Sequence, residues 1–252
     1  MRQQTILVTG ASAGFGTAFA RRFVADGHRV IATARRAERL AALSAELGGR
    51  LLAWPLDVTD GPALAALPAS LPDGWREVDV LVNNAGLALG LEPAWRASLA
   101  EWEQMIATNI LGLTRLTRAL LPGMVERNRG HVVNISSAAA SYPYPGGNVY
   151  GATKSFVTQF SLNLKADLVG TSVRVTSIEP GMVEGTEFST VRFGGDAERA
   201  KTVYAGTKSL TAEDIAETVA WAVGLPEHVN IDRIEVMPTC QGPGPFRVVR
   251  QT

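Results

Sequence analysis

The chain has 252 residues, of which 24 are basic, 24 acidic and 46% apolar. This apolar share with moderate charge is enough for a hydrophobic core, which excludes disordered and collagen-like chains. A formal net charge of zero argues against a nucleic-acid binder, because phosphates require a basic surface. The single cysteine, Cys240, leaves no intramolecular disulfide, and the histidines lack ligand spacing, so we expect no metal site.

No apolar run approaches the roughly 20 residues that span a bilayer. The first residues lead directly into an apolar run too short for a secretion signal. We therefore expect a soluble, cytoplasmic protein without membrane contacts. The length fits one α/β domain over residues 1–252, since the chain contains no long polar linker and no repeat.

Seven short runs rich in β-branched residues are typical of β-strands, and stretches long enough for a helix separate most of them. This alternation predicts a parallel sheet with helices on both faces, in a doubly wound α/β fold. The expected strands are Thr5–Thr9, Arg29–Thr33, Leu51–Leu56, Val78–Asn83, His131–Ser136, Val173–Ile178 and Ile231–Met237.

One long helix is indicated by Phe156, Phe160, Leu164 and Leu168, which recur every four residues as an apolar stripe. Gly170 follows where a left-handed C-terminal cap would lie.

Two further segments are expected at the surface. Residues 61–72 predict a short helix with turns. Residues 180–205 contain four glycines and no clear periodicity. Because a long loop in a compact domain is usually functional, this segment predicts a substrate lid.

The first expected strand ends in a glycine-rich turn that precedes a helix. Glycines let backbone N–H groups approach a pyrophosphate at a helix N-terminus, where the dipole favours negative charge. The alternative is an ordinary turn without a ligand. We expect a dinucleotide here, held by Thr9, Gly10, Ser12, Gly14, Phe15 and Gly16.

The second expected strand is followed by Arg35 and Arg36, at the place where an acid would bind the ribose 2′-hydroxyl of NAD. Guanidinium groups are always charged and suit a 2′-phosphate. These residues therefore predict NADP as the cofactor, with a solvated basic turn as the alternative.

The same turn also matches G-x-S-x-G, the nucleophile elbow of α/β-hydrolases, around Ser12. Asp214 and His228 follow in the order a triad requires. However, only one strand precedes Ser12, so no upstream loop can donate the second oxyanion-hole N–H. A serine hydrolase is thus a minor alternative.

Tyr150 and Lys154 stand at the head of the predicted long helix, about 6 Å apart along its axis. A nearby ammonium would lower the phenol pKa from about 10 toward neutral, so that the tyrosine could exchange a proton with a carbonyl or alcohol. Taken by itself, a tyrosine and a lysine four residues apart would also fit two unrelated side chains on the surface of a helix. Ser136 and Ser137 end the preceding strand, at the sheet edge where α/β proteins bind ligands.

Together these motifs resemble the short-chain dehydrogenase/reductase family over essentially the whole length. The resemblance implies a Rossmann-type fold with a seven-stranded parallel sheet, NADP-dependent hydride transfer, and a homotetramer or homodimer. The matching elements are the Thr9–Gly16 turn, Asp57-Val58, Asn83–Gly86, Asn109, Ser137, Tyr150 with Lys154, and Pro180-Gly181 with Thr186.

The family assigns a role to each matching residue. Tyr150 would be the general acid/base, and Lys154 would lower its pKa and hold the nicotinamide ribose. Ser137, chosen over Ser136 by its distance from the tyrosine, would orient the carbonyl, and Asn109 would anchor a water. The remaining cofactor contacts would come from Asp57, Val58, Asn84, Ala85, Gly86, Pro180, Gly181, Val183 and Thr186.

A closer resemblance is to the NADP-dependent 3-hydroxy acid dehydrogenases, which act on L-serine, L-allo-threonine and 3-hydroxypropionate. It is carried by Asn84–Gly90, Leu121–Asn128, Gly146–Lys154, Gly185–Ser189, Val191–Asp196 and Glu235–Pro238, whereas Gly242–Phe246 departs from the pattern.

A 3-hydroxy acid carries a carboxylate, so its pocket needs a cation. Arg192 lies in the expected lid, and we predict that it binds the substrate together with Ser137 and Tyr150. A sulfonate would suit the same arginine, so a sulfoacetaldehyde-type reductase is one alternative. A non-catalytic NADP-binding sensor is another.

Overall fold

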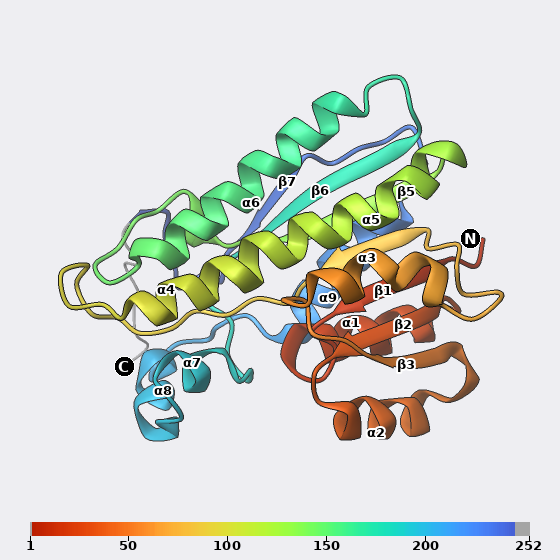
Figure 1. Cartoon of the computed structure of the whole chain (residues 1–252). Coiled ribbons are helices and arrows are strands. Elements are labelled where there is room, and N and C mark those ends of the chain that lie inside the picture. Colours follow the sequence, from red (N-terminus) through yellow and green to blue (C-terminus); the bar gives the residue numbers. More distant parts are fainter. Residues whose placement is uncertain (1, 245–252) are drawn as a thin grey trace.

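The structure is a computed structural model that describes residues 2–244. The seven strands in this part of the chain form one parallel sheet in the order β3-β2-β1-β4-β5-β6-β7 (Figure 1). This order confirms the predicted doubly wound, Rossmann-type fold. The strands are β1 (Thr5–Thr9), β2 (Arg29–Ala34), β3 (Leu51–Pro55), β4 (Val80–Asn83), β5 (Gly130–Ile135), β6 (Val173–Pro180) and β7 (Arg233–Val236).

Helices cover both faces of the sheet (Figure 1). One face carries α1 (Gly14–Ala25), α2 (Ala37–Leu47) and α9 (Ala212–Gly224), and the other carries α3 (Gly61–Ser70), α5 (Leu113–Glu126) and α6 (Asn148–Asp167). Helix α4 (Leu99–Ile106) continues through a π-helical turn, η2 (Ala107–Gly112), into α5. The shorter elements are the turns η1 (Gly48–Arg50) and η3 (Ala138–Ala140) and the helices α7 (Phe188–Arg192) and α8 (Ala197–Tyr204). None of the helices in residues 2–244 has the length and apolar character of a membrane span.

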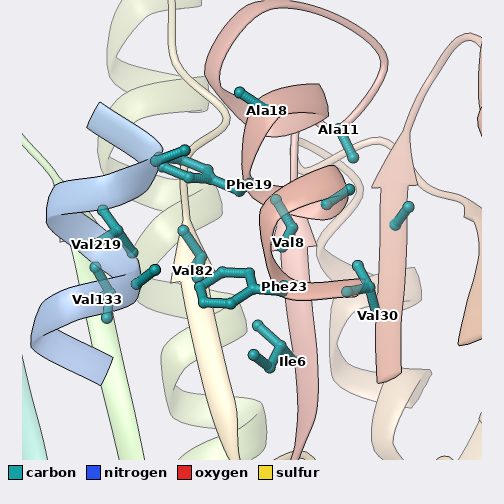
Figure 2. Packing of buried hydrophobic residues seen from close by; sticks show 14 of the residues in the cluster. Ile6, Val8, Ala11, Ala18, Phe19, Phe23, Val30, Val82, Val133 and Val219 are labelled. Atoms are coloured by element: carbon teal, nitrogen blue, oxygen red, sulfur yellow. The ribbon is translucent and has the colours of Figure 1, made fainter. Parts of the chain in front are cut away.

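Strand β1 contributes to two separate cores because successive side chains point to opposite faces. Ile6 and Val8 pack toward α1 and α9, whereas Leu7 packs toward α3 and α5. Figure 2 shows Phe19 and Phe23 of α1 on the face of the sheet that α1 and α9 cover. Burying each such ring contributes about 1.5–3 kcal/mol. Burial on both faces explains why the middle of β1, residues 6–8, is apolar.

The strand order reverses between β1 and β4, because β2 and β3 lie on one side of β1 and β5–β7 on the other. Parallel strands end at one edge of a sheet, and a crevice opens there where the order reverses. The turns that follow Thr9 of β1 and Asn83 of β4 therefore meet at this edge.

Residues 180–205, which the sequence predicts as a loop, contain the helices α7 and α8, so that part of the prediction is wrong. Gly194 and Gly195, at φ +63° and +100°, separate the two helices. The Asp196 carboxylate then caps α8 by accepting a hydrogen bond of 2.9 Å from the backbone N–H of Arg199. At five and eight residues, both helices are too short to produce a visible period.

The predicted long helix is α6, and Gly170 just beyond it adopts the expected left-handed conformation, at φ +92°. The apolar stripe is only partly buried. Leu164 lies in the core, but Phe156 is 38% exposed and stacks on Phe160 with ring centroids 5.9 Å apart. The buried face of α6 is more polar than the stripe and includes Tyr150 and Lys154.

Candidate active site

A cavity of about 890 Å³ lies along the carboxyl edge of the sheet. It extends from the glycine turn after β1, past the end of β2, to the head of α6 and the segment that holds α7. Three of the predicted site residues, Thr9, Gly16 and Asn109, do not line it. Those that do are Gly10, Ser12, Gly14, Phe15, Arg35, Arg36, Asp57, Val58, Asn84, Ala85, Gly86, Ser137, Tyr150, Lys154, Pro180, Gly181, Val183, Thr186 and Arg192.

The glycine turn presents the N-terminus of α1 to one end of the cavity. Gly10 and Gly14 have φ values of +68° and +53°, which favour glycine. The residue before the helix, Ala13, offers no side-chain cap, so no side chain competes for the first N–H groups of α1. A Cβ at Gly16 would lie 2.7 Å from the Ala11 Cα atom. This residue therefore serves close backbone packing beneath the turn and does not face a ligand.

Thr9 does not line the cavity itself, but it bonds to residues that do. Its hydroxyl accepts hydrogen bonds from the backbone N–H groups of Asn84 and Ala85, at 2.9 and 2.8 Å. The Asn84 side-chain amide in turn donates to the Thr9 carbonyl at 2.7 Å. These bonds join the ends of β1 and β4, so Thr9 shapes the turn that lines the cavity but does not reach into it.

Guanidinium groups gather at the β2 end of the cavity, as the sequence predicts. Arg36 donates from Nε to the Ser12 hydroxyl at 3.1 Å and pairs with the Glu187 carboxylate at 2.9 Å. Arg39, which the sequence analysis missed, pairs with the same carboxylate at 2.7 Å. It stands one helical turn after Arg36, a spacing that could have revealed it.

The hydrolase alternative gains no support from these contacts. The Ser12 hydroxyl has Arg36 as its hydrogen-bond partner. Asp214, the acid of the alternative triad, closes a capping box with Thr211 at the start of α9.

The other end of the cavity centres on the buried phenol of Tyr150, which is 6% exposed. Ser137 lines the cavity beside this phenol and favours its ionised form, and the Phe188 ring packs against the phenol with centroids 5.7 Å apart. The Lys154 ammonium lies 5.8 Å from the ring centroid and donates a hydrogen bond of 2.9 Å to the Ile135 carbonyl. The structure thus brings the three predicted catalytic side chains together.

The sequence predicts that the Lys154 ammonium lowers the pKa of Tyr150. This prediction is wrong for the side chains of the protein by themselves. Burial raises the pKa of Tyr150 to about 12, against the smaller opposing effects of the Ser137 hydrogen bond and the Arg192 charge. Burial likewise lowers the pKa of Lys154 to about 8. The physical reason is that both groups lose solvation, which disfavours the charged form of each. The phenol therefore carries its proton at neutral pH.

Asn109 is buried within the π-helical turn η2. Its carbonyl accepts a hydrogen bond from the Leu87 N–H at 2.9 Å. Its amide donates to the Leu87 carbonyl at 2.9 Å and to the Thr153 hydroxyl at 3.0 Å. The side chain is thus occupied in joining η2, the segment after β4, and α6.

Arg192 lies beside Tyr150, with its guanidinium carbon 5.5 Å from the phenol ring centroid. It donates to the Tyr144 hydroxyl at 2.5 Å and to the Gly90 carbonyl at 3.3 Å. Tyr204 of α8, which the sequence analysis missed, lines the same region and hydrogen-bonds to Ser189 at 2.7 Å. The reacting end thus combines two cations, Arg192 and Lys154, with several hydroxyl groups.

Of the two tyrosines before α6, only Tyr144 lines the cavity, because the Tyr142 hydroxyl donates to Glu235 at 3.2 Å. Gln241, which precedes the divergent tail, accepts a hydrogen bond from the Met182 N–H at 2.7 Å. In that tail, Pro245 and Phe246 lie outside the described residues.

Comparisons with known proteins agree with this geometry. The family model described as short chain dehydrogenase matches residues 4–194. The NADP-dependent 3-hydroxy acid dehydrogenase YdfG of Salmonella typhi is 64% identical over 236 residues, covering 94% of this chain and 95% of that protein. Serine 3-dehydrogenase of Rhizobium radiobacter is 54% identical over 248 residues, covering 98% and 99%.

Solved structures give the same result. The closed form of a serine dehydrogenase complexed with NADP+ has a TM-score of 0.94 and 58% identity, over 98% of this chain and 100% of that one. Serine dehydrogenase from Escherichia coli has a TM-score of 0.84 and 54% identity, over 94% and 99%. By its sequence, its sheet topology and its side chains at the sheet edge, the chain belongs to the short-chain dehydrogenase family.

Proposed function

We propose that the protein transfers a hydride between NADP(H) and a short 3-hydroxy acid or the corresponding oxo acid. The observation that carries this proposal is the position of Arg192, 5.5 Å from the Tyr150 ring in a cavity that continues to the glycine turn. A cation beside the proton-donating phenol suits a substrate that carries an anionic group close to its hydroxyl or carbonyl carbon.

NADP fits the residues at the other end of the cavity. The uncapped N-terminus of α1 offers N–H groups to a pyrophosphate. Arg35 and Arg36 line this end of the cavity and would supply positive charge to a 2′-phosphate, with Arg39 one helical turn further along α2. Asp57 and Val58 would lie beside the adenine, and the Pro180–Thr186 segment would lie beside the nicotinamide. The names of the relatives, NADP-dependent 3-hydroxy acid dehydrogenase and serine 3-dehydrogenase, support the same assignment.

When bound, NADPH supplies the hydride, and the protein supplies orientation and the proton. Ser137 would hydrogen-bond to the substrate carbonyl and hold it against the phenol. Because burial raises the pKa of Tyr150 to about 12, this phenol is protonated at neutral pH and can donate its proton to the developing alkoxide. Lys154 would orient the nicotinamide ribose, and Asn109 would hold the backbone of the segment after β4.

Arg192 would bind the substrate carboxylate through its guanidinium group. A sulfonate would suit the same group, so sulfoacetaldehyde is the nearest alternative substrate. The segment 180–205 would act as the lid that carries this arginine, within a single domain of residues 1–252. A homotetramer or homodimer and a cytoplasmic location stay predictions from the sequence.

The test is a reduction and oxidation screen with NADPH or NADP+ over malonic semialdehyde, 3-hydroxypropionate, serine and threonine stereoisomers, isethionate and simple alcohols. We expect Tyr150→Phe to lower kcat about a hundredfold or more while NADPH binding is retained. Binding with no turnover by the wild-type chain on any of these substrates would favour the non-catalytic sensor.

A second variant tests the carboxylate site. Arg192→Ala should raise KM for 3-hydroxypropionate at least tenfold and leave neutral alcohols within about threefold, because it removes a charge-assisted pair to the acid only. Equal losses on acidic and neutral substrates would show that Arg192 has no role in binding the acid.

A further inference from the structure

Helix α7 (Phe188–Arg192) crosses the cavity and is attached at both ends to the body of the protein. At its N-terminal end, the Glu187 carboxylate binds Arg36 at 2.9 Å through one oxygen and Arg39 at 2.7 Å through the other. At its C-terminal end, Arg192 donates to the Tyr144 hydroxyl at 2.5 Å. These contacts join the arginines at the start of α2 to the side chains around Tyr150.

The backbone on either side of α7 has the freedom to let this helix move. Gly185 precedes it at φ +74°, and Gly194 and Gly195 follow it at φ +63° and +100°. A Cβ placed at any of the three would find nothing within 4 Å. The N–H groups of Gly194 and Gly195 donate to carbonyls of α7 itself, those of Val191 at 3.1 Å and Thr190 at 2.8 Å. The position of α7 is therefore set by the contacts of its own side chains and by one backbone hydrogen bond of 3.0 Å, which the Arg192 carbonyl accepts from the Gly90 N–H.

Glu187 makes both of the ion pairs that attach the N-terminal end. Its side chain is 43% exposed, and those of Arg36 and Arg39 are 38% and 46% exposed. Solvent weakens each pair at this exposure, but one carboxylate shared by two guanidiniums favours a single geometry. Burial alone would raise the pKa of Glu187, yet hydrogen bonds from Arg39 and Arg36 outweigh it and keep the pKa below its usual value. The carboxylate is thus charged at neutral pH.

From this geometry we infer that Glu187 and Arg39 are positioning residues, which fasten α7 across the cavity and thereby hold Arg192 and Phe188 against Tyr150. Neither residue touches the reacting atoms. The inference rests on the proposed function for its kinetic consequences, but the attachment of α7 itself can be measured without any substrate or cofactor.

The first experiment is hydrogen exchange of residues 186–192 in the chain alone. Glu187→Gln keeps the size of the side chain and removes its charge, so both ion pairs weaken. We expect exchange in this segment to rise about three- to tenfold. Arg39→Ala removes one of the two pairs and should produce part of this rise. The double variant, with both Glu187→Gln and Arg39→Ala, should exchange no faster than Glu187→Gln alone, because both substitutions break the same contact.

The chain offers a matched control in Arg21 and Glu46. This pair has the same 2.7 Å distance and similar exposure, 53% and 45%, and neither residue lines the cavity. Glu46→Gln should therefore leave exchange of residues 186–192 unchanged. Unchanged exchange in Glu187→Gln, or an equal rise in Glu46→Gln, would overturn the inference.

The second experiment measures kinetics with acidic and neutral aldehydes and NADPH. If α7 positions Arg192, Glu187→Gln should raise KM for the acidic aldehyde about three- to tenfold and change kcat and the neutral aldehyde's KM less than twofold. Glu187→Asp should restore part of the loss. Tighter NADPH binding with unchanged exchange would show instead that Glu187 competes with the 2′-phosphate, which would overturn the inference. A wild-type chain that reduces neither aldehyde would refute the proposed function and leave the exchange result standing.

Discussion

Replacement of Lys154 by methionine should abolish turnover and at the same time stabilise the fold. The lysine is buried, and its ammonium donates a hydrogen bond of 2.9 Å to the Ile135 carbonyl. Burial lowers the pKa of Lys154 from 10.5 to about 8, so the folded chain binds this proton less tightly than the unfolded chain does. Methionine has a similar unbranched shape and carries no charge to desolvate.

The size of the gain follows from the two pKa values. A change from 10.5 to about 8 corresponds to about 3 kcal/mol of unfavourable free energy for the charged lysine at pH 7. Loss of the hydrogen bond to Ile135 removes about 1 kcal/mol. We therefore expect Lys154→Met to raise the free energy of unfolding by about 2 kcal/mol at pH 7.

The gain should depend on pH in a defined direction. Above the folded pKa of about 8, the folded chain has released the proton while the unfolded chain keeps it up to about 10.5. The unfolded state then binds more protons, so the wild-type chain gains stability relative to the variant as the pH rises. By pH 9.5 it should have recovered about 2 kcal/mol, which brings the two chains to nearly equal stability.

Urea unfolding at one protein concentration, at pH 7.0 and 9.5, measures these differences. The wild-type chain and Lys154→Met should show the same dependence of unfolding free energy on urea, so that only the midpoints differ. A variant less stable than wild type at pH 7, or a difference that does not change with pH, would refute the burial argument.

Two further substitutions test the nucleotide end of the cavity. The double variant with alanine at Arg35 and Arg36 should raise KM for NADPH tenfold or more and KM for NADH less than threefold, because only NADPH carries a 2′-phosphate. Equal rises in steady-state assays would contradict this assignment. Gly16→Ala should lower stability by about 1–3 kcal/mol and abolish NADPH binding, since its Cβ would lie 2.7 Å from the Ala11 Cα atom. Thermal unfolding and fluorescence titration measure both effects, with Gly49→Ala as the control, because a Cβ there meets nothing within 4 Å.

The central strands of the sheet could be predicted from the sequence because they are covered on both faces. Burial on both sides requires a nearly continuous apolar run, and the bounds predicted for β1 agree with the structure at both ends. Helix α7 could not be predicted, because its five residues fill little more than one turn. One of the residues that hold it in place is Glu187, whose partner Arg39 is 148 residues away in the chain. Contacts over such distances leave no local pattern.

Most residues of the candidate site could be named from the sequence, but the partners and the solvation of their side chains could not. Tyr150 and Lys154 stand one turn apart, and this spacing led us to expect mutual stabilisation of their charges. In the structure, the Lys154 ammonium points to the Ile135 carbonyl, and burial is the largest influence on both groups. Solvation depends on all the elements that surround a side chain, so no spacing within one helix can reveal it.

The charges around Tyr150 affect both directions of the proposed reaction, reduction of the carbonyl and oxidation of the alcohol. Burial leaves Tyr150 with its proton at neutral pH, which is the state that reduction of a carbonyl requires. Oxidation of the alcohol requires the phenolate, and the cations near that ring are the Lys154 ammonium, 5.8 Å from its centroid, and the Arg192 guanidinium, 5.5 Å away. A substrate carboxylate bound to Arg192 would offset one of these charges and disfavour the phenolate further. The Arg192 charge by itself lowers the pKa of Tyr150, so an acidic substrate that neutralises this charge would keep the phenol in the protonated state that carbonyl reduction uses.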